Sequence, residues 1–513
     1  MVELLIDYAR KNNIILEMNE KNKFGDNVLL WATINNNIEM DELLIDYASK
    51  NNIILKMNEK NEYKNNPLLL ATSKNNIQMV KLLIDYANKN NIILEMNEKN
   101  EKGHNLLLFV TSNNNIEMVR ILIDYVNNNN NILELNEKNK FGDNLLTWAV
   151  INNDIEIIKL LIDYANKNNI ILVLNEKNSS RSYPLLSAVD KNNNEMVKLL
   201  IDYANKNNII LEMNEINEYE NYPLLLATSK NNIEMVKLLI DYANENNIIL
   251  EINEKNKNGY YPLLFATFEN NIEIFKLLIN YTKKNKIILE IIEKDEKGNY
   301  PLLLAVSNNN IEMVQLLINY DHRNNIILEM NKKNESKDFP LLFATSNNNI
   351  EIINLLIEYA KENSIILKMN RKNKNGCYPL LFATSNNNIE IINLLIDYAK
   401  KNRIILEINE KDEKGNYPLL LATFKNNIEM IELLIDYANE NNIKNNIILE
   451  MNEKNKYGNY PLLLAINNNN VDMVKLLINY ADQNEITLEI NEKDKKESFP
   501  LLNAIIKNNI EIL

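Results

Sequence analysis

The residues best suited to acid–base or nucleophilic chemistry are His104, His322 and Cys377, the only histidines and the only cysteine among 513 residues. Histidine can act as a general base or a metal ligand near neutral pH. The two histidines lie far apart in the sequence, in separate segments of a repeating pattern, so we expect that they do not meet at one metal ion or substrate. We interpret His104 and Cys377 as residues of exposed turns and His322 as part of a polar tract. We predict no catalytic or metal site.

Carboxylate pairs and glycines also lack the pattern of a chemical site. Pairs such as Glu234 and Asp241 recur in almost every segment of the chain. A catalytic pair is expected at one place only, so we interpret the repeated pairs as a solvated helix face. The eight glycines form neither G-x-x-x-x-G-K-S/T nor G-x-G-x-x-G, and hence no phosphate-binding loop is indicated. We predict that the chain is not an enzyme and binds no cofactor.

The elements of this chain repeat with a period of about 39 residues, a length typical of repeat proteins. Ten equal steps separate Val28 from Pro418, the next step is four residues longer, and the last has the usual length. We call the position that Val28 and Pro418 occupy in their segments the proline slot. Glycine, where present, lies three residues before it, and asparagine always lies eight residues after it, from Asn36 to Asn508. The slot is filled by Val28, Pro67, Leu106, Leu145, Pro184, Pro223, Pro262, Pro301, Pro340, Pro379, Pro418, Pro461 and Pro500.

Each segment predicts two helices and an extended leg, as in residues 222–259. Pro223 suits the first turn of a short helix, because its missing N–H would be unpaired there anyway. The small Ala227 predicts the close approach of a neighbouring helix. Asn231 is expected to end this helix in the left-handed region, and Asn232 to cap the second helix. The leg then leads to a turn that begins the next segment.

The second helix is predicted to be buried on two sides. Glu234, Lys237 and Asp241 form one solvated stripe, whereas most other positions of residues 233–243 are apolar. An apolar face this wide needs helices on both sides, as in a stack of repeats. A tyrosine recurs in this helix thirteen times, from Tyr8 to Tyr480, and we interpret it as core packing.

The segments resemble the ankyrin repeat over essentially the whole chain. The resemblance implies an all-α fold with short hairpin-like fingers, a curved and elongated helix-turn-helix solenoid of about twelve to thirteen lengthened repeats. The family pattern G-x-T-P-L-H-x-A-A-x-x-G-H-x-E-I-V-x-L-L-L is matched in one segment by Gly259, Pro262, Leu263, Ala266, Asn270, Asn271, Glu273, Ile274, Leu277, Leu278 and Ile279.

Three departures from that pattern carry expectations. The family's Thr before the proline is Tyr or Phe here, as at Tyr222, Tyr261 and Phe339, so we expect apolar and aromatic packing in place of the family's Thr–His hydrogen bond. The glycine between the helices is Asn. The period exceeds that of the family by about six residues. We place this insertion at the end of the second helix, around residues 244–247, as a raised rim on the outer side.

We divide the chain into a partial repeat at 1–27, repeats at 28–500 and a truncated repeat at 501–513, with a four-residue insertion near 441–446. The chain begins and ends inside a second helix, and apolar residues such as Leu4, Leu5, Ile510 and Ile512 would face open ends. We therefore expect fraying and end-to-end association between copies. The same observation raises the hypothesis that the chain is a fragment of a larger protein with an effector domain.

The segment at Pro184 is predicted to be an internal weak point. It has Arg181 in place of the glycine, Ser187 in place of a leucine, and Asn194 where other segments have Ile or Val. A buried and unpaired Asn194 would cost about 1–3 kcal/mol. Fast hydrogen exchange is then expected at residues 179–200.

Composition argues against several classes of binding partner and cellular location. The net charge of −14 argues against nucleic acid and against an anionic membrane surface. No apolar run approaches the roughly 18 residues that a membrane-spanning helix needs, so we predict no membrane insertion. Glu3 and Asp7 interrupt the first apolar stretch, which argues against a signal peptide. A single cysteine fits a reducing compartment. We expect a soluble, cytoplasmic protein.

The resemblance implies a non-catalytic scaffold that binds a protein partner through finger tips and a concave first-helix surface. Phe268 and Phe424 stand where most other segments carry a polar residue such as Ser, and an exposed aromatic residue is a plausible anchor. The alternative is an architectural spacer without a specific ligand, which the near-identity of the repeats also fits. The variable residues that we single out as candidate contacts are Lys257, Asn258, Tyr260, Phe268, Glu269, Asn299, Cys377, Phe424 and Lys425.

Overall fold

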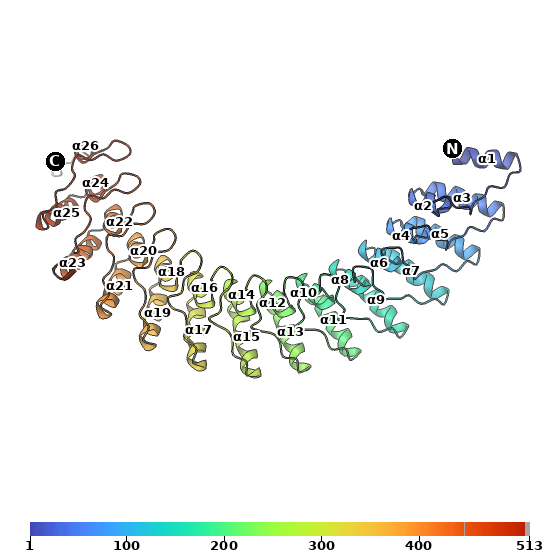
Figure 1. The fold of residues 1–513 in the computed structure, drawn as a ribbon, viewed down its shortest axis with the longest axis horizontal. Helices are drawn as coiled ribbons and strands as arrows, with labels where there is room; N and C mark the ends of the chain where they lie inside the picture. The colour runs from blue at the N-terminus through green and yellow to red at the C-terminus, as the bar shows by residue number, and fades with distance from the viewer. Residues whose placement is uncertain (446, 508–513) are drawn as a thin grey trace. The chain divides into compact units, whose positions relative to one another are not determined.

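The computed structural model describes residues 1–445 and 447–507. These residues form α-helices joined by turns and extended legs, with no β-strand and one isolated bridge between Lys138 and Asn144 (Figure 1). The short first helices of the repeats are α2 (Val28–Ile34), α4 (Pro67–Ser73), α6 (Leu106–Ser112), α8 (Leu145–Ile151), α10 (Pro184–Asp190), α12 (Pro223–Ser229), α14 (Pro262–Phe268), α16 (Pro301–Ser307), α18 (Pro340–Ser346), α20 (Pro379–Ser385), α22 (Pro418–Phe424), α24 (Pro461–Asn467) and α26 (Pro500–Ile506).

The second helices are longer, and each follows its first helix after a short turn. They are α3 (Ile38–Lys50), α5 (Ile77–Lys89), α7 (Ile116–Asn128), α9 (Ile155–Lys167), α11 (Asn194–Lys206), α13 (Ile233–Glu245), α15 (Ile272–Asn285), α17 (Ile311–Asn324), α19 (Ile350–Glu362), α21 (Ile389–Lys401), α23 (Ile428–Asn445) and α25 (Val471–Gln483), preceded by α1 (Val2–Lys11). The predicted all-α repeat solenoid is confirmed.

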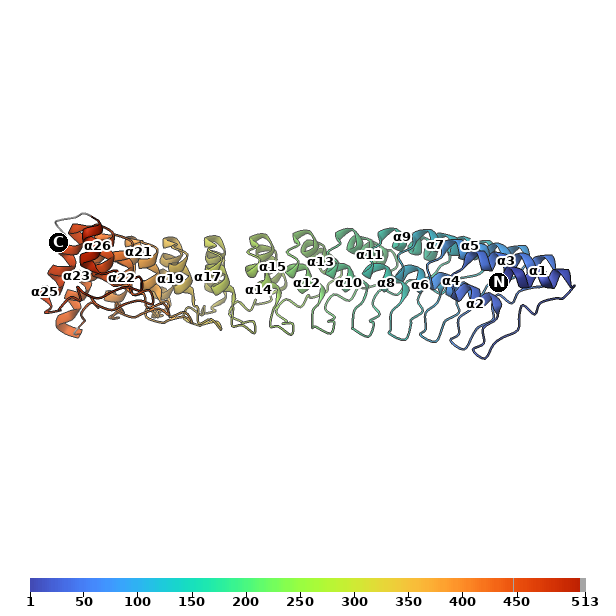
Figure 2. The same ribbon diagram turned by 90° about the horizontal axis from the view of Figure 1, so that it is seen from above.

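The helices belong to two compact units, Met1–Lys257 with α1–α13 and Asn258–Leu513 with α14–α26. Within each unit, first helices pack against first helices and second helices against second helices, in two layers. Figure 2 shows the loops before the first helices projecting from the edge of that layer. We call these loops the fingers. The surface of the first-helix layer beside them is called the first-helix face.

The first helices begin where the proline slot predicts. Proline occupies the first turn of α12, and Leu224, Leu225 and Ala227 behind it are buried. The position of Ala227 has no exposed surface in any repeat except the truncated last one, where Ala504 is 2 % exposed, which confirms the predicted close approach of neighbouring helices. In the first four complete repeats an asparagine precedes the slot instead of an aromatic residue. Its side chain caps the helix, as Asn66 does by accepting the Leu69 N–H at 2.8 Å.

The aromatic residue before the proline does more than pack, and this corrects the expectation of purely apolar contact. Tyr222 is buried, and its hydroxyl donates to the carbonyl oxygen of Glu254 in the next leg at 2.9 Å. Tyr261 makes the same bond to Glu293 at 3.1 Å. Burial raises the pKa of both phenols well above the usual range, so they stay protonated donors. A polar link to the next repeat therefore replaces the family's Thr–His bond.

The pair of asparagines between the helices behaves as predicted and also joins repeats. Asn231 lies in the left-handed region at φ 55°, and the Asn232 side chain accepts the Met235 N–H at 2.9 Å. The Nδ2 of the capping asparagine in addition donates to Oδ1 of the left-handed asparagine one repeat earlier. We call this contact the asparagine bridge. It joins Asn76 to Asn36, Asn115 to Asn75, Asn193 to Asn153, Asn232 to Asn192, Asn310 to Asn270, Asn349 to Asn309, Asn388 to Asn348, Asn427 to Asn387 and Asn470 to Asn426, at 2.5–2.9 Å.

The extended leg is held by side chains of both neighbouring repeats. The hydroxyl of Tyr86 in α5 accepts the Leu55 N–H at 3.0 Å and donates to the Ile53 carbonyl at 3.2 Å. Asn19 of the preceding leg donates to the Ile54 carbonyl at 2.9 Å and accepts the Lys56 N–H at 3.0 Å. The recurring tyrosine, expected as core packing, is therefore also a hydrogen-bonding residue. These bonds satisfy backbone groups that a β-strand partner would otherwise pair.

One leg lacks the asparagine that makes this double contact. Ile292 occupies the position that Asn331 and Asn370 fill in the next two repeats. Asn331 donates to the Ile366 carbonyl at 2.9 Å and accepts the Lys368 N–H at 3.0 Å. Replacing Ile292 by asparagine places a side-chain amide opposite the Ile327 carbonyl and the Glu329 N–H, which correspond to the two backbone groups that Asn331 contacts.

We expect Ile292→Asn to raise the free energy of unfolding by about 1 kcal/mol, since two hydrogen bonds are gained and a half-buried methyl surface is lost. The matched change Asn331→Ile should lower it by about 1–2 kcal/mol. Urea titrations of the three proteins measure both differences. Equal stability of all three would show that the double contact contributes nothing.

The weak point predicted at the Pro184 segment is not supported. Asn194 is half-buried rather than buried, and its side chain donates to Glu234 Oε2 at 2.6 Å and accepts from Asn232 Nδ2 at 2.9 Å. Arg181 adopts the left-handed conformation at φ 57°, and the Ser187 hydroxyl lies 2.8 Å from that of Ser182. The premise of an unpaired buried amide was wrong, because the neighbouring repeat supplies partners for it.

The segment in which we place the insertion follows the end of the second helix. Helix α13 runs to Glu245, and Asn247 beyond it takes the left-handed conformation at φ 55°. Helix α23 has 18 residues where most second helices have 13, so the added residues near 441–446 lengthen this helix as far as Asn445. Asn446 and the predicted features at Asn508, Ile510 and Ile512 lie outside the described residues.

A buried carboxyl group was not anticipated. Asp41 in α3 has no exposed surface, and neither of its carboxyl oxygens has a hydrogen-bond partner. Valine occupies the same position in α5 and α7, as Val80 and Val119. Burial raises the pKa of Asp41 from 3.8 to about 7, because the apolar surroundings disfavour the charged form.

Candidate functional site

The fingers are tight loops built on one polar side chain each. In the finger after α13, Gly259 has φ +77°, and a Cβ added there would lie 2.9 Å from the Asp295 Cα of the next finger. In the next finger the Asp295 carboxylate accepts the Asn299 N–H at 2.7 Å. Adjacent fingers also touch through backbone, as Glu296 N–H donates to the Asn258 carbonyl at 3.3 Å. The fingers are thus a stacked series of closed loops rather than regular β-hairpins.

An aromatic cluster stands on the first-helix face at α14. Tyr260 stacks on Phe265 with ring centroids 4.6 Å apart, and it meets Phe268 edge-on at 6.5 Å. Phe268 is 50 % exposed, whereas Tyr260 and Phe265 are half-buried. The finger thus supplies one ring and the first helix the other two. The cluster offers flat apolar surface that is held in place by neighbouring rings.

The other candidate contacts are spread along the chain. Phe424 is 60 % exposed at the end of α22, next to the exposed Lys425, four repeats beyond Phe268. Lys257, Asn258 and Glu269 are exposed, and Lys257 belongs to the unit Met1–Lys257 whereas the others belong to Asn258–Leu513. The structure brings Tyr260 together with Phe268. It does not bring Phe424 close to them.

Asn299 and Cys377 are less accessible than the sequence suggested. Asn299 donates to Asp295 Oδ2 at 3.0 Å and accepts from Asn334 at 3.2 Å, so it holds two fingers together. Cys377 is half-buried, and not in an exposed turn. Burial and the nearby Asp412 carboxylate raise the pKa of its thiol. It therefore stays protonated at neutral pH and is a poor nucleophile.

The two histidines differ in their exposure. His104 is half-buried, which corrects the expectation of an exposed turn, and its ring meets Phe109 edge-on at 5.1 Å. Burial lowers its pKa, with Lys102 acting in the same direction. His322 is exposed in the last turn of α17, 3.6 Å from Glu362. Within 1–445 and 447–507, no group of three or more His, Cys, Asp or Glu side chains is arranged to hold a metal ion.

Sequence reasoning overlooked one position of the first-helix face, three residues after the proline slot. The aromatic residues there are half-buried or exposed, although their neighbours on both sides are core residues, whereas Leu226, Leu304 and Leu464 at the same position are buried. The signal was available, since this position varies where the two preceding positions are almost always leucine. Its large members are Trp31, Phe109, Trp148, Phe265, Phe343 and Phe382.

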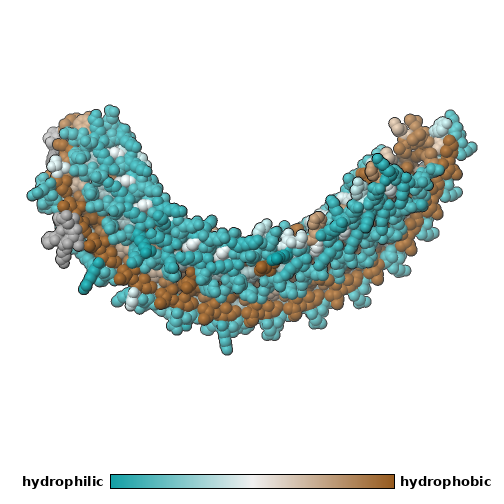
Figure 3. All heavy atoms as spheres, in the orientation of Figure 1, coloured by the Kyte–Doolittle hydropathy of each residue, from teal (hydrophilic) through white to brown (hydrophobic). Residues whose placement is uncertain are grey.

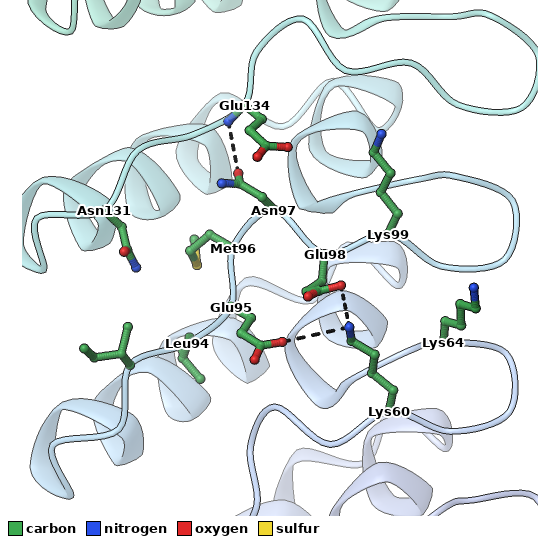
Figure 4. Close-up of a pocket in the computed structure, with 11 residues that line it drawn as sticks. Lys60, Lys64, Leu94, Glu95, Met96, Asn97, Glu98, Lys99, Asn131 and Glu134 are labelled. Carbon is green, nitrogen blue, oxygen red and sulfur yellow. Dashed lines mark hydrogen bonds and ion pairs between the residues drawn. The ribbon is translucent and has the colours of Figure 1, made fainter.

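One cleft of about 790 Å³ lies between neighbouring repeats on the leg side. Figure 4 shows Lys60 facing Glu98 and Glu95, and Asn97 bonded to the backbone of Glu134. Lysine and glutamate side chains neutralise one another here, and the asparagine contact is of the same kind as the contact of Asn19 with the leg of Ile54. The cleft is part of the contact between two repeats, and its lysines and glutamates form ordinary ion pairs instead of an isolated acid–base pair.

The comparisons agree with this architecture. The model "Ankyrin repeats (3 copies)" matches the chain in overlapping stretches that cover residues 1–447, and the model "Ankyrin repeat" matches residues 457–488. A comparison with curated proteins gives no match. No helix of the described part is long and apolar enough to cross a membrane. Ankyrin repeats are generally protein–protein interaction modules and are typically non-catalytic. The chain belongs to the ankyrin repeat family.

Proposed function

We propose that the chain is a non-catalytic scaffold that binds a protein partner through the first-helix face and the finger tips. The observation that carries the proposal is the aromatic cluster of Tyr260, Phe265 and Phe268. Exposed aromatic rings held by packing lose little conformational freedom on binding, which is why such residues dominate interface energetics. Phe424 with Lys425 is a second anchor in the same proposal.

A double variant, Phe268→Ser with Phe424→Ser, tests the proposal. These substitutions install the residue that other repeats carry at the same position, as at Ser307 and Ser346, and therefore leave the joints intact. We expect the variant to lose a bound protein in affinity purification from the native cell, with at least tenfold weaker binding of that protein after isolation. The matched control is Ile478→Ser, which removes an exposed apolar side chain of the second helix α25. Equal capture by wild type and double variant would refute the anchors.

The second candidate is an architectural spacer, and the asparagine bridges favour it. The same contact recurs at one joint after another within each unit, as a structure under load would require. A spacer binds no partner through the first-helix face, so purification would recover the same proteins with the double variant. A third candidate is a longer protein in which an effector domain outside these residues supplies the activity. Sequencing of the full gene would test this.

We further propose that copies associate through their ends and that the protein is intracellular. Leu4 and Leu5 of α1, and Leu501 and Ile505 of α26, are exposed, and their burial against a second copy would be favourable. The single cysteine supports a reducing compartment. Sedimentation of Leu4→Ser with Leu5→Ser should show a smaller average mass than wild type if the ends associate.

A further inference from the structure

An unassigned row of isoleucines is exposed on the legs. In the legs from Ile15 to Ile405, the residue before the leucine of the recurring N-I-I-L-E stretch is an exposed isoleucine, while that leucine is buried or, in the first leg, half-buried. Isolated exposed apolar residues are normal, but a row in register marks an interaction surface. We call this row the isoleucine ridge. Its members expose 43–68 % of their surface: Ile15, Ile54, Ile93, Ile132, Ile171, Ile210 and Ile249 in Met1–Lys257, and Ile288, Ile327, Ile366 and Ile405 in Asn258–Leu513.

The space-filling view agrees with this recurrence. Figure 3 shows apolar surface gathered in a band that continues from repeat to repeat in each unit, with polar atoms on both sides. The backbone beside the ridge is already paired. The Ile54 carbonyl accepts from the Asn19 amide, and the Lys56 N–H donates to Asn19 Oδ1. A partner therefore cannot add a strand to the leg. It must bind through side chains.

The exposed area is large enough for a stable contact. Seven isoleucines of the unit Met1–Lys257 expose more than half of their surface, on the order of 100 Å² each and 700 Å² for the row. The largest apolar patch of a typical monomer covers about 300–600 Å². A standard interface buries about 800 Å² on each partner. The ridge of one unit thus supplies most of one side of such an interface.

The period of the ridge selects its occupant. Packed helices lie about 8–10 Å apart, so a partner must present apolar groups at that spacing over seven repeats. A second copy of this chain has a ridge of the same spacing. Clefts lie beside ridge residues: Ile93 lines one of about 790 Å³ with Leu94 and Met96, and in the other unit Ile366 lines one of about 630 Å³ with Ile365. A side chain of a second ridge can enter such a cleft.

Charge also favours a second copy over an anionic membrane. The cleft beside Ile93 carries Lys60, Lys64 and Lys99 together with Glu95 and Glu98. Lys60 is already paired with Glu95 and Glu98, so two such surfaces can meet antiparallel without strong like-charge repulsion, as an interface between identical surfaces requires. The net charge of −14 repels anionic lipid.

We propose that the isoleucine ridge of Met1–Lys257 is the interface of an antiparallel dimer, in which the ridges of two copies interdigitate. The proposal is independent of the partner that binds the first-helix face.

The test is sedimentation of the full chain across micromolar concentrations, with a variant that carries Ile93→Ser, Ile132→Ser and Ile171→Ser. With Leu4→Ser and Leu5→Ser present in both proteins to suppress the proposed association through the ends, we expect the chain with an intact ridge to reach the mass of a dimer, and the isoleucine variant to dissociate with a dissociation constant at least tenfold higher. Asn88→Ser, Asn127→Ser and Asn166→Ser, which change exposed residues of the second helices, form the matched control and should dimerise as wild type. Circular dichroism checks that all three proteins are folded.

Other outcomes overturn the proposal. A monomeric wild type excludes the interface, and so does a dimer that the isoleucine variant keeps. A series of larger oligomers that Leu4→Ser with Leu5→Ser abolishes would assign association to the ends instead, because end-to-end contacts do not close. Binding of wild type, but not of the isoleucine variant, to zwitterionic phosphatidylcholine vesicles without dimer formation would assign the ridge to a lipid surface.

Discussion

Replacing Asp41 by valine is expected to stabilise the first repeats by about 4 kcal/mol at pH 8. Asp41 is fully buried without a partner, and burial raises its pKa to about 7. Ionisation in the unfolded chain but not in the folded one costs about 1.4 kcal/mol per pH unit between the two pKa values. Valine removes this cost and adds buried apolar surface, as Val80 does at the same position of the next repeat.

The pH dependence of that difference identifies its cause. Because the pKa of folded Asp41 lies above that of the unfolded chain, its contribution to the free energy of unfolding is most favourable below about pH 4. The contribution falls as the pH rises from about 4 to about 7, and is constant above that. The advantage of Asp41→Val should therefore be several-fold smaller at pH 4.5 than at pH 8.

Hydrogen exchange at α2–α5, at both pH values, measures this locally. Asp41→Asn is the control, since its amide does not titrate. Its stability relative to Asp41→Val should be independent of pH. An advantage of valine that is the same at both pH values would mean that ionisation of Asp41 does not limit stability.

Replacing Asn349 by alanine is expected to lower the free energy of unfolding by about 2 kcal/mol. The Asn349 side chain accepts the Ile352 N–H at 2.9 Å and thereby caps α19. The same side chain donates to Asn309 at 2.7 Å in the asparagine bridge. Loss of a helix cap costs about 1 kcal/mol, and loss of the bridge leaves Asn309 without that donor.

The variant Asn349→Asp separates the two contributions. Aspartate keeps the cap, as Asp154 does by accepting the Ile157 N–H at 3.0 Å, but it cannot donate to Asn309. Its cost should be about half that of alanine. The converse change, Asp154→Asn, should stabilise the chain by restoring a donor. Urea titrations give all three values. A loss for aspartate as large as that for alanine would show that the bridge, and not the cap, determines the stability of this position.

Most of the fold could be predicted because each repeated position obeys a local rule. Pro223, Asn231 and Asn232 specify a helix start, a left-handed turn and a cap from their own chemistry, and all three predictions are confirmed. The ankyrin resemblance placed these elements in a stack. Local rules do not predict a hydrogen bond to a residue one repeat away. The bridge to Asn192 and the Tyr222 hydroxyl bond to Glu254 depend on the stacking distance, and neither was anticipated.

The candidate surface was predictable only in part, for a related reason. Exposure of Phe268 and Phe424 follows from their position at the end of a first helix. The contact of Phe268 with Tyr260 depends on where the finger folds back. Asn299 looked equally free in sequence, but a neighbouring finger uses its side chain. The misjudged Asn194 and the overlooked Asp41 show the same limit: whether a polar residue is satisfied depends on a neighbour that the repeat itself does not contain.

The asparagine bridge has a consequence for how such a gene can change. Donor and acceptor come from the same two positions of successive repeats, and neither carries a charge that must be matched elsewhere. Unequal recombination that deletes or duplicates whole repeat periods therefore recreates each joint with its partners already in place. The array can be shortened or lengthened during evolution without inventing a new interface, whereas a crossover out of phase would place unmatched side chains at the joint.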